Sequence, residues 1–364
     1  MTRRRRPHRS PHRSPQGLPH QRRPPRPATP GRATAVPPTA AWVARSEVDL
    51  VALVPQVLGF HPSESVVVLS FGGPGGFHAR ADLPHRPAAQ QELARLLAGA
   101  CRANGAPRAA VLLYTSYHER AGVQARVLLA ELQAAGLDVV DVLRVHDGRW
   151  FEPLRDDEVG TAYDLAVHPF TARAVYEGRA VLADREALQA SLLGGDETER
   201  ARLATSADLR TRLLAGDAAP DRLGREARWL RGRVHEAVRS GEPLDTADAA
   251  RLLAAVVRGD VRDAAWVDLR RHGARPHVAL WLDLVRRAPR HLLPGPCGLL
   301  ALAAYLHGDG ALAWCAIDRS REVVPHHSLV DLVADLLQGA VPPDAWPEPS
   351  AGALPLLRDD DRAS

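Results

Sequence analysis

The stretch Ser65-Val66-Val67-Val68-Leu69-Ser70-Phe71 decides the fold, because an uncharged run rich in β-branched residues predicts a strand buried on both faces. Before it, Ser46-Glu47-Val48-Asp49 has the spacing of a capping box, and apolar residues then recur at helical intervals up to Gly59. After it, the glycine-rich residues 72–76 and an alternating stretch from His78 to Leu83 predict a hairpin with a second strand.

The next hundred residues alternate between helix and strand patterns. Residues 88–103 and 119–135 predict amphipathic helices, and residues 109–115 and 138–145 predict strands that we expect to pair in parallel. Asp147-Gly148 is a tight-turn signal, so a last strand should fold back through Trp150-Phe151. The order β-β-α-β-α-β-β predicts the α/β class, with an N-terminal α/β sandwich built on a mixed sheet.

Beyond Gly160 the periodicity is helical throughout. Leu, Ala and Val recur at spacings of three and four residues, and Asp184 and Asp245 are placed to cap helices. We therefore expect an α/β domain over residues 46–160, an all-helical C-terminal domain over residues 161–345 and a flexible C-terminal tail over residues 346–364.

Residues 1–45 predict a disordered tail. Residues 1–40 hold ten Arg, ten Pro and no acid, a composition that cannot bury enough apolar surface to order itself. Such a tail is either simply solvated, the product of a start codon placed too far upstream, or an arm that binds nucleic acid weakly through phosphates. The remaining 324 residues carry 37 Arg and 43 acids, so the basic pI belongs to the tail.

Composition and missing motifs exclude several function classes. The three cysteines, Cys101, Cys297 and Cys315, form no C-x-x-C pair and no even-numbered framework, which fits a reducing cytoplasm. The longest apolar stretch, Cys297 to Leu306, is too short to span a membrane. Residues 72–76 lack the G-x-G-x-x-G spacing of a phosphate-binding loop and precede a strand. We therefore assign no catalytic residue, no metal and no cofactor.

Two candidate ligand-binding residues lie at strand ends. Thr115 follows a predicted strand, and ligands of α/β sheets sit beyond the carboxyl ends of strands. His61 precedes the first strand and would lie at the opposite end of the sheet if the two strands were parallel. The alternative is that His61 and Ser63 end the preceding helix and cap the turn.

Four further candidates lie between the predicted domains, where ligands often bind: Tyr163, Asp164, His168 and Arg173. A carboxylate close to a histidine could perform acid–base chemistry there. The alternative is that His168-Pro169-Phe170 starts a helix and that Asp164 belongs to the preceding loop. A basic cluster that includes Arg286, Arg287 and Arg290 could contact phosphates, although surface ion pairing is the default.

Several motifs resemble an actinobacterial family of unknown function, DUF4192. They include Leu58-Gly59-Phe60-His61-Pro62, Val261-Arg262-Asp263-Ala264-Ala265-Trp266 and Gly308-Asp309-Gly310-Ala311-Leu312-Ala313-Trp314, and the similarity spans about residues 46–345. The resemblance implies no reaction, ligand or partner. Ala301 to Pro325 also resembles part of a tetratricopeptide unit, a pattern that a simple helical hairpin would satisfy equally well.

The function expected from these features is a cytoplasmic binding or scaffold protein whose helical half offers a surface to a protein partner. The first alternative is an enzyme that acts on a small molecule at the junction of the two domains. The second is nucleic-acid association through the Arg-rich tail. We expect no membrane partner.

Overall fold

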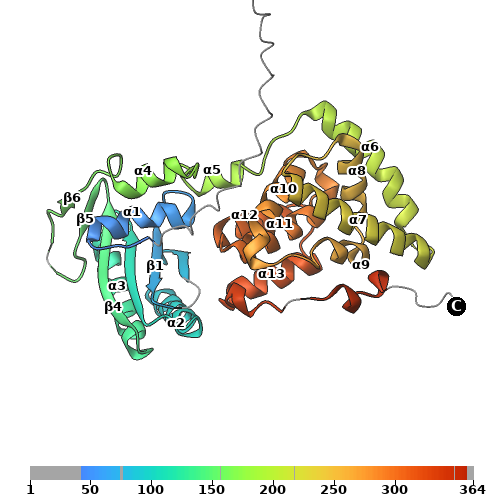
Figure 1. Cartoon of the computed structure of the whole chain (residues 1–364). Helices are drawn as coiled ribbons and strands as arrows, with labels where there is room; N and C mark the ends of the chain where they lie inside the picture. The colour runs from blue at the N-terminus through green and yellow to red at the C-terminus, as the bar shows by residue number, and fades with distance from the viewer. Residues whose placement is uncertain (1–41, 74–76, 156, 217, 348, 359–364) are drawn as a thin grey trace, which may run out of the picture. The chain divides into compact units, whose positions relative to one another are not determined.

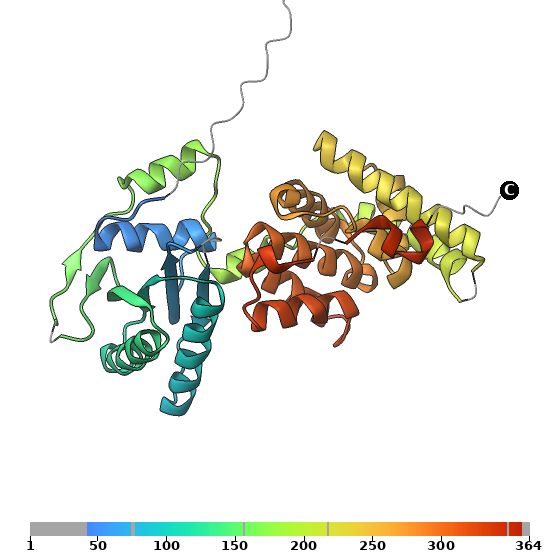
Figure 2. The same ribbon diagram turned by 60° about the horizontal axis from the view of Figure 1, so that its bottom comes forward.

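The computed structural model describes residues 42–73, 77–155, 157–216, 218–347 and 349–358. Residues 1–41 of the expected tail over residues 1–45 lie outside the described residues, as do residues 74–76 of the predicted hairpin loop. The N-terminal half is a mixed sheet flanked by helices, and the C-terminal half is helical, which confirms the predicted α/β class (Figures 1 and 2).

The sheet has the strand order β2-β1-β3-β4-β5-β6. Its strands are β1 (Ser65–Phe71), β2 (His78–Asp82), β3 (Arg108–Tyr114), β4 (Asp138–His146), β5 (Arg149–Phe151) and β6 (Thr161–Ala162). β3 and β4 are parallel as predicted, whereas β1 is antiparallel to both β2 and β3. β5 folds back on β4 through Asp147-Gly148, and both turn residues have the positive φ of a type I′ turn.

Three helices cover the two faces of the sheet (Figure 1). α1 (Glu47–Leu58) packs against the face that carries Leu69 and Leu112, whereas α2 (Pro87–Ala103) and α3 (His118–Ala134) pack against the face that carries Val68 and Leu113. β1 is therefore buried on both faces, as its continuous apolar sequence predicts. The predicted capping box of α1 is present, with Ser46 and Asp49 each accepting a backbone hydrogen bond from the other residue.

The helical half is built around one apolar helix, α11 (Pro294–His307), which is buried from Gly295 to Leu306. Such a helix must be enclosed by others, and it contacts α10, α12 and α13. The helices after the sheet are α4 (Pro169–Tyr176), α5 (Arg185–Ala190), α6 (Glu197–Leu214), α7 (Pro220–Ser240), α8 (Thr246–Ala255), α9 (Gly259–Arg262), α10 (Ala274–Arg287), α11, α12 (Gly310–Arg321) and α13 (Ser328–Gln338). α11 and α12 form a helical hairpin that turns at Gly308; its kinship with tetratricopeptide units stays a prediction.

Three expectations about segment ends need correction. β6 lies beyond Gly160 and pairs with β5, so the first two residues of the expected all-helical domain belong to the sheet. Trp42 is described and packs edge-on against the Phe170 ring, so the last part of the expected tail over residues 1–45 is in contact with α4. Residues 351–357 form short 3-10 helices, and Leu357 is buried, because this apolar segment packs on α7 instead of forming a flexible tail.

Gly160 occupies a position that excludes any side chain. Its φ is +63°, and a Cβ there would lie 2.5 Å from the Phe151 ring. Gly160→Ala is therefore expected to lower the free energy of unfolding by about 2 kcal/mol, through backbone strain and displacement of the ring. Chemical denaturation measures the change. Gly99→Ala is the control, because a Cβ at this position in α2 meets no other atom, and this variant should be as stable as the wild type or more stable. Equal losses of unfolding free energy in the two variants would contradict the requirement for glycine at position 160.

Candidate functional site

Three chain segments meet at one edge of the sheet because of its strand directions. Ser65, at the start of β1, pairs with Tyr114, at the end of antiparallel β3, and Tyr114 also pairs with Val145 of parallel β4. The loop before β1 therefore lies beside the loops that follow β3 and β4. His61 and Thr115 thus lie at the same edge of the sheet. We had expected them at opposite ends if the strands that follow His61 and precede Thr115 were parallel, but β1 and β3 are antiparallel.

These segments line an open cavity of about 360 Å³, which we call the edge cavity. Its lining comprises His61, Pro62, Ser63, Glu64, Tyr114, Thr115, Ser116, Val145, His146, Asp147 and Tyr163. This volume falls at the lower end of the roughly 300–1,000 Å³ range of small-molecule sites. Its position beyond the carboxyl ends of a parallel strand pair is where ligands of α/β sheets bind.

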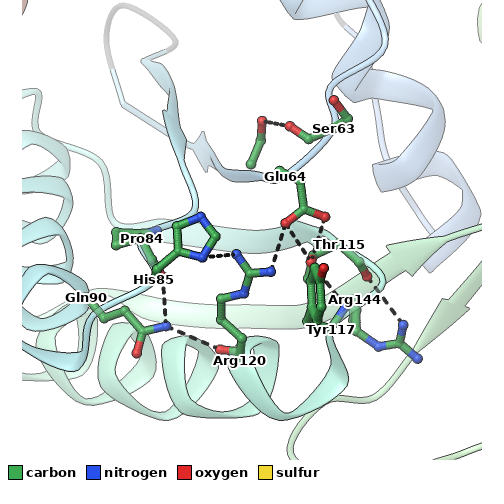
Figure 3. Close-up of polar contacts among 10 residues, drawn as sticks. Ser63, Glu64, Pro84, His85, Gln90, Thr115, Tyr117, Arg120 and Arg144 are labelled. Atoms are coloured by element: carbon green, nitrogen blue, oxygen red, sulfur yellow. Dashed lines mark hydrogen bonds and ion pairs between the residues drawn. The ribbon is translucent and has the colours of Figure 1, made fainter.

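Glu64 organises the polar network at the rim of this cavity (Figure 3). Thr115 Oγ1 donates a hydrogen bond to the Glu64 carboxylate at 2.9 Å, and Arg120 Nη2 lies 3.1 Å from Glu64 Oε2. Arg120 comes from the first turn of α3, and its side chain is largely buried. The guanidinium therefore compensates the charge of Glu64, while half of the Glu64 side chain stays exposed and can accept further hydrogen bonds.

Neighbouring groups hold Thr115 and Arg120 in place. The Tyr117 amide donates to Thr115 Oγ1 at 3.2 Å, and Arg144 Nη1 donates to the Thr115 carbonyl at 3.4 Å. The Arg120 guanidinium lies 4.1 Å from the centre of the Tyr117 ring and donates to His85 Nδ1 at 3.1 Å (Figure 3). With both partners of the Glu64 carboxylate fixed in this way, its oxygens have a defined orientation.

The backbone around the edge cavity is unusual at two positions. Glu64 has φ +41° and Asp147 has φ +46°, values that non-glycine residues rarely adopt. The type I′ turn explains Asp147, whereas Glu64 lies in the bend that directly precedes β1. Strained residues of this sort concentrate at functional sites, and here the strained residue is the one that organises the network.

Two tyrosines supply the phenolic hydroxyl groups of the cavity lining. The Tyr114 hydroxyl is buried and has no hydrogen-bond partner within the described part of the chain. Burial, with a smaller contribution from Tyr163, raises the pKa of Tyr114 well above 10, and burial also raises the pKa of Tyr163. Both phenols are therefore neutral near pH 7 and can donate a hydrogen bond, but neither is available as a base.

The structure brings together three of the six predicted site residues. His61, Thr115 and Tyr163 all line the edge cavity. No side-chain cap by His61 or Ser63 occurs among the described contacts, because Gly59 ends α1 and Ser63 contributes its carbonyl oxygen to Ser65 Oγ. The capping alternative is therefore replaced by a position in the cavity lining.

The other three predicted residues have structural partners outside this cavity. His168 caps α4 by accepting from the Phe170 amide, and its Nε2 lies 3.0 Å from Asp49 Oδ1. Asp164 accepts from the Ala166 amide, and Arg173 pairs with Glu177 at 2.7 Å and stacks over Trp42. Of Tyr163, Asp164, His168 and Arg173, only Tyr163 therefore lines the edge cavity, and the contacts of His168 and Asp164 match the structural alternative.

The sequence reading missed Glu64, Arg120 and Tyr114 as members of a site. Taken alone, each sequence position indicates only local structure: Glu64 a turn, Arg120 a helix and Tyr114 a strand. The antiparallel pairing of β1 with β3 is what joins them, and no local pattern encodes it.

The described helices include none that is both long and apolar enough to cross a membrane, and no cluster of three or more potential metal ligands occurs among the described residues. No curated protein and no solved structure matches the chain. The family model described as a domain of unknown function, DUF4192, matches residues 48–344, which include the sheet, the edge cavity and the helices through α13. The chain is therefore a member of the DUF4192 family.

Proposed function

We propose that the protein is a binding protein whose edge cavity takes a small, uncharged, hydroxyl-rich molecule of the size of a monosaccharide or a nucleoside. The observation that carries the proposal is the cavity beyond the carboxyl ends of β3 and β4, whose lining includes Tyr114, a residue with a buried hydroxyl that has no hydrogen-bond partner among the described residues. A buried polar group without a partner is costly, so it marks a place where a ligand gains a hydrogen bond.

The lining chemistry supports a neutral ligand over an anion. No arginine of the described residues lines the edge cavity, the charge of Glu64 is compensated by Arg120, and Asp147 adds a negative charge. The lining offers donors from tyrosine hydroxyls and acceptors from Glu64, and His61, His146 and Ser116 can do either. A ligand with several hydroxyl groups matches this mixture, and the tyrosine rings can pack on its apolar face.

Equilibrium dialysis tests this proposal. The full chain is dialysed against an equimolar mixture of monosaccharides, nucleosides and amino acids, and retained compounds are identified by mass spectrometry. We expect a neutral polyhydroxyl compound to be retained. Tyr114→Phe should weaken its binding about fivefold, since one hydrogen bond is lost.

Two comparisons keep the result interpretable. Tyr114→Phe removes a hydroxyl that has no hydrogen-bond partner in the described part of the chain, so the free energy of unfolding of the variant should equal or exceed that of the wild type. Tyr176→Phe removes an exposed hydroxyl and is the matched control, which should bind as the wild type does. If the mixture yields no retained compound, or if Tyr114→Phe binds as tightly as Tyr176→Phe, the proposal is wrong.

The remaining functional expectations stay predictions. A protein partner on the helical half and a cytoplasmic location follow from the sequence alone. Nucleic-acid association through the Arg-rich tail concerns residues 1–40, which lie outside the described residues. The enzyme alternative was based on a shared cleft of Tyr163, Asp164, His168 and Arg173, of which only Tyr163 lines the edge cavity.

A further inference from the structure

A second cavity, of about 460 Å³, lies among helices of the C-terminal half. We call it the arginine cavity and define it by Arg200 of α6, Arg286 of α10, Arg319 of α12, and Glu197, Arg290 and His291 beside them. Four of these six side chains are guanidinium groups and one is a carboxylate, so the cavity lining carries a net positive charge.

The acids near this cavity are already paired. Glu197 pairs with Arg200, Asp208 contacts His291 Nε2 at 2.7 Å, and Glu322 pairs with Arg319. The positive charges that remain are those of Arg286 and Arg290, neither of which pairs with a carboxylate among the described residues. Arg286 Nε donates to the Ser191 carbonyl at 2.7 Å, and Arg290 Nη2 donates to the Glu322 carbonyl at 2.9 Å. Carbonyl oxygens orient a guanidinium without neutralising its charge.

Arg287 shows what a structural arginine looks like in this region. It is the immediate neighbour of Arg286, and it pairs with Glu199 at 2.7 Å and with Asp283 at 3.0 Å. In the basic cluster predicted from the sequence, Arg287 is thus paired with carboxylates, whereas Arg286 and Arg290 line the cavity without a carboxylate partner among the described residues.

One donor of a residue in the cavity lining has no partner among the described residues. Arg319 Nε is buried and forms no hydrogen bond within the described part of the chain, although Nη1 of the same guanidinium pairs with Glu322. A buried charged donor of this kind calls for an acceptor.

From these observations we infer that the arginine cavity binds a compact organic phosphate through Arg286, Arg290 and Arg319. Guanidinium groups fit phosphate oxygens with two parallel hydrogen bonds, which favours a phosphate over a halide. Leu193 and Val285 contribute apolar surface to the cavity lining, and the cavity is larger than an inorganic phosphate ion. The bound phosphate therefore carries an organic group. The arginine cavity shares no lining residue with the edge cavity.

Isothermal titration calorimetry with glycerol 3-phosphate and phenyl phosphate, with glycerol as the uncharged control, tests this site on the full chain. We expect both phosphates to bind, glycerol not to bind, and added salt to weaken binding. Arg286→Gln and Arg290→Gln should each weaken binding about tenfold, the effect of removing one charge-assisted hydrogen-bonding group. Arg290 is exposed, so its variant keeps the test valid should Arg286→Gln fold poorly.

Arg202→Gln is the matched control, because it removes an exposed arginine of α6 outside the cavity lining. It should change the affinity less than twofold, and Tyr114→Phe should also bind as the wild type does. Absence of saturable binding for both phosphates overturns the inference. So does unchanged binding in both cavity variants, or an equal loss of affinity in Arg202→Gln.

Discussion

Replacing Trp281 by Ala is expected to lower the free energy of unfolding by about 3–5 kcal/mol, the range typical of a large buried aromatic side chain. Trp281 is fully buried on α10, which packs against the apolar helix α11. Its removal leaves a cavity that α11 cannot fill, because α11 is already enclosed by α12 and α13. Urea denaturation monitored by circular dichroism measures the loss.

Trp229→Ala is the control for this change. Trp229 is only partly buried on α7, where the Arg251 guanidinium lies 3.8 Å from its ring centre, so about 1 kcal/mol is expected. A loss for Trp281→Ala no larger than that for Trp229→Ala would show that the helical half does not pack as described.

Acidification is expected to destabilise the protein through buried imidazoles, of which His277 is the clearest. Burial lowers the pKa of His277 to about 4, Asp268 partly opposes the shift, and His235 adds to it. The unfolded chain, with a histidine pKa near 6.5, therefore takes up the proton first as the pH falls. The stabilising contribution is complete above about pH 6.5 and is lost progressively toward pH 4. Between pH 7 and pH 5, His277 should account for a loss of about 2 kcal/mol.

Unfolding free energies of the wild type and of His277→Gln across pH 5–7 test this assignment. The variant should lose less stability on acidification by about 2 kcal/mol. The rest of the pH dependence should persist, because burial also lowers the pKa values of His78 and His327 to about 4. His272→Gln, which alters an exposed histidine, should follow the wild-type curve. Parallel curves for the wild type and His277→Gln would contradict the assignment.

Local sequence patterns predict the elements of this fold well, because each rests on interactions within a few residues. The capping box at Ser46 and the helix caps at Asp184 and Asp245 are all present, and Asp147-Gly148 forms the predicted turn. β6 was missed because two residues are too short for any periodicity to mark them as a strand.

The candidate site was only partly predictable, because it depends on strand order. Thr115 could be proposed from its place after a buried strand, and His61 and Tyr163 were proposed on other grounds. Their common location follows from the pairing of Ser65 with Tyr114, which is a contact between distant segments. The positive φ at position 64 could not be predicted from the sequence, because the residue there is Glu and not the glycine or asparagine that usually adopts this conformation.

The central claim is that the edge cavity binds a neutral polar molecule. A crystal structure of the full chain soaked with the compound retained in dialysis tests it most directly. We predict electron density for that compound in the edge cavity, with an oxygen or nitrogen atom within hydrogen-bonding distance of Tyr114 Oη. Density for the compound at another site, or an edge cavity filled only by solvent at saturating concentration, would contradict the account.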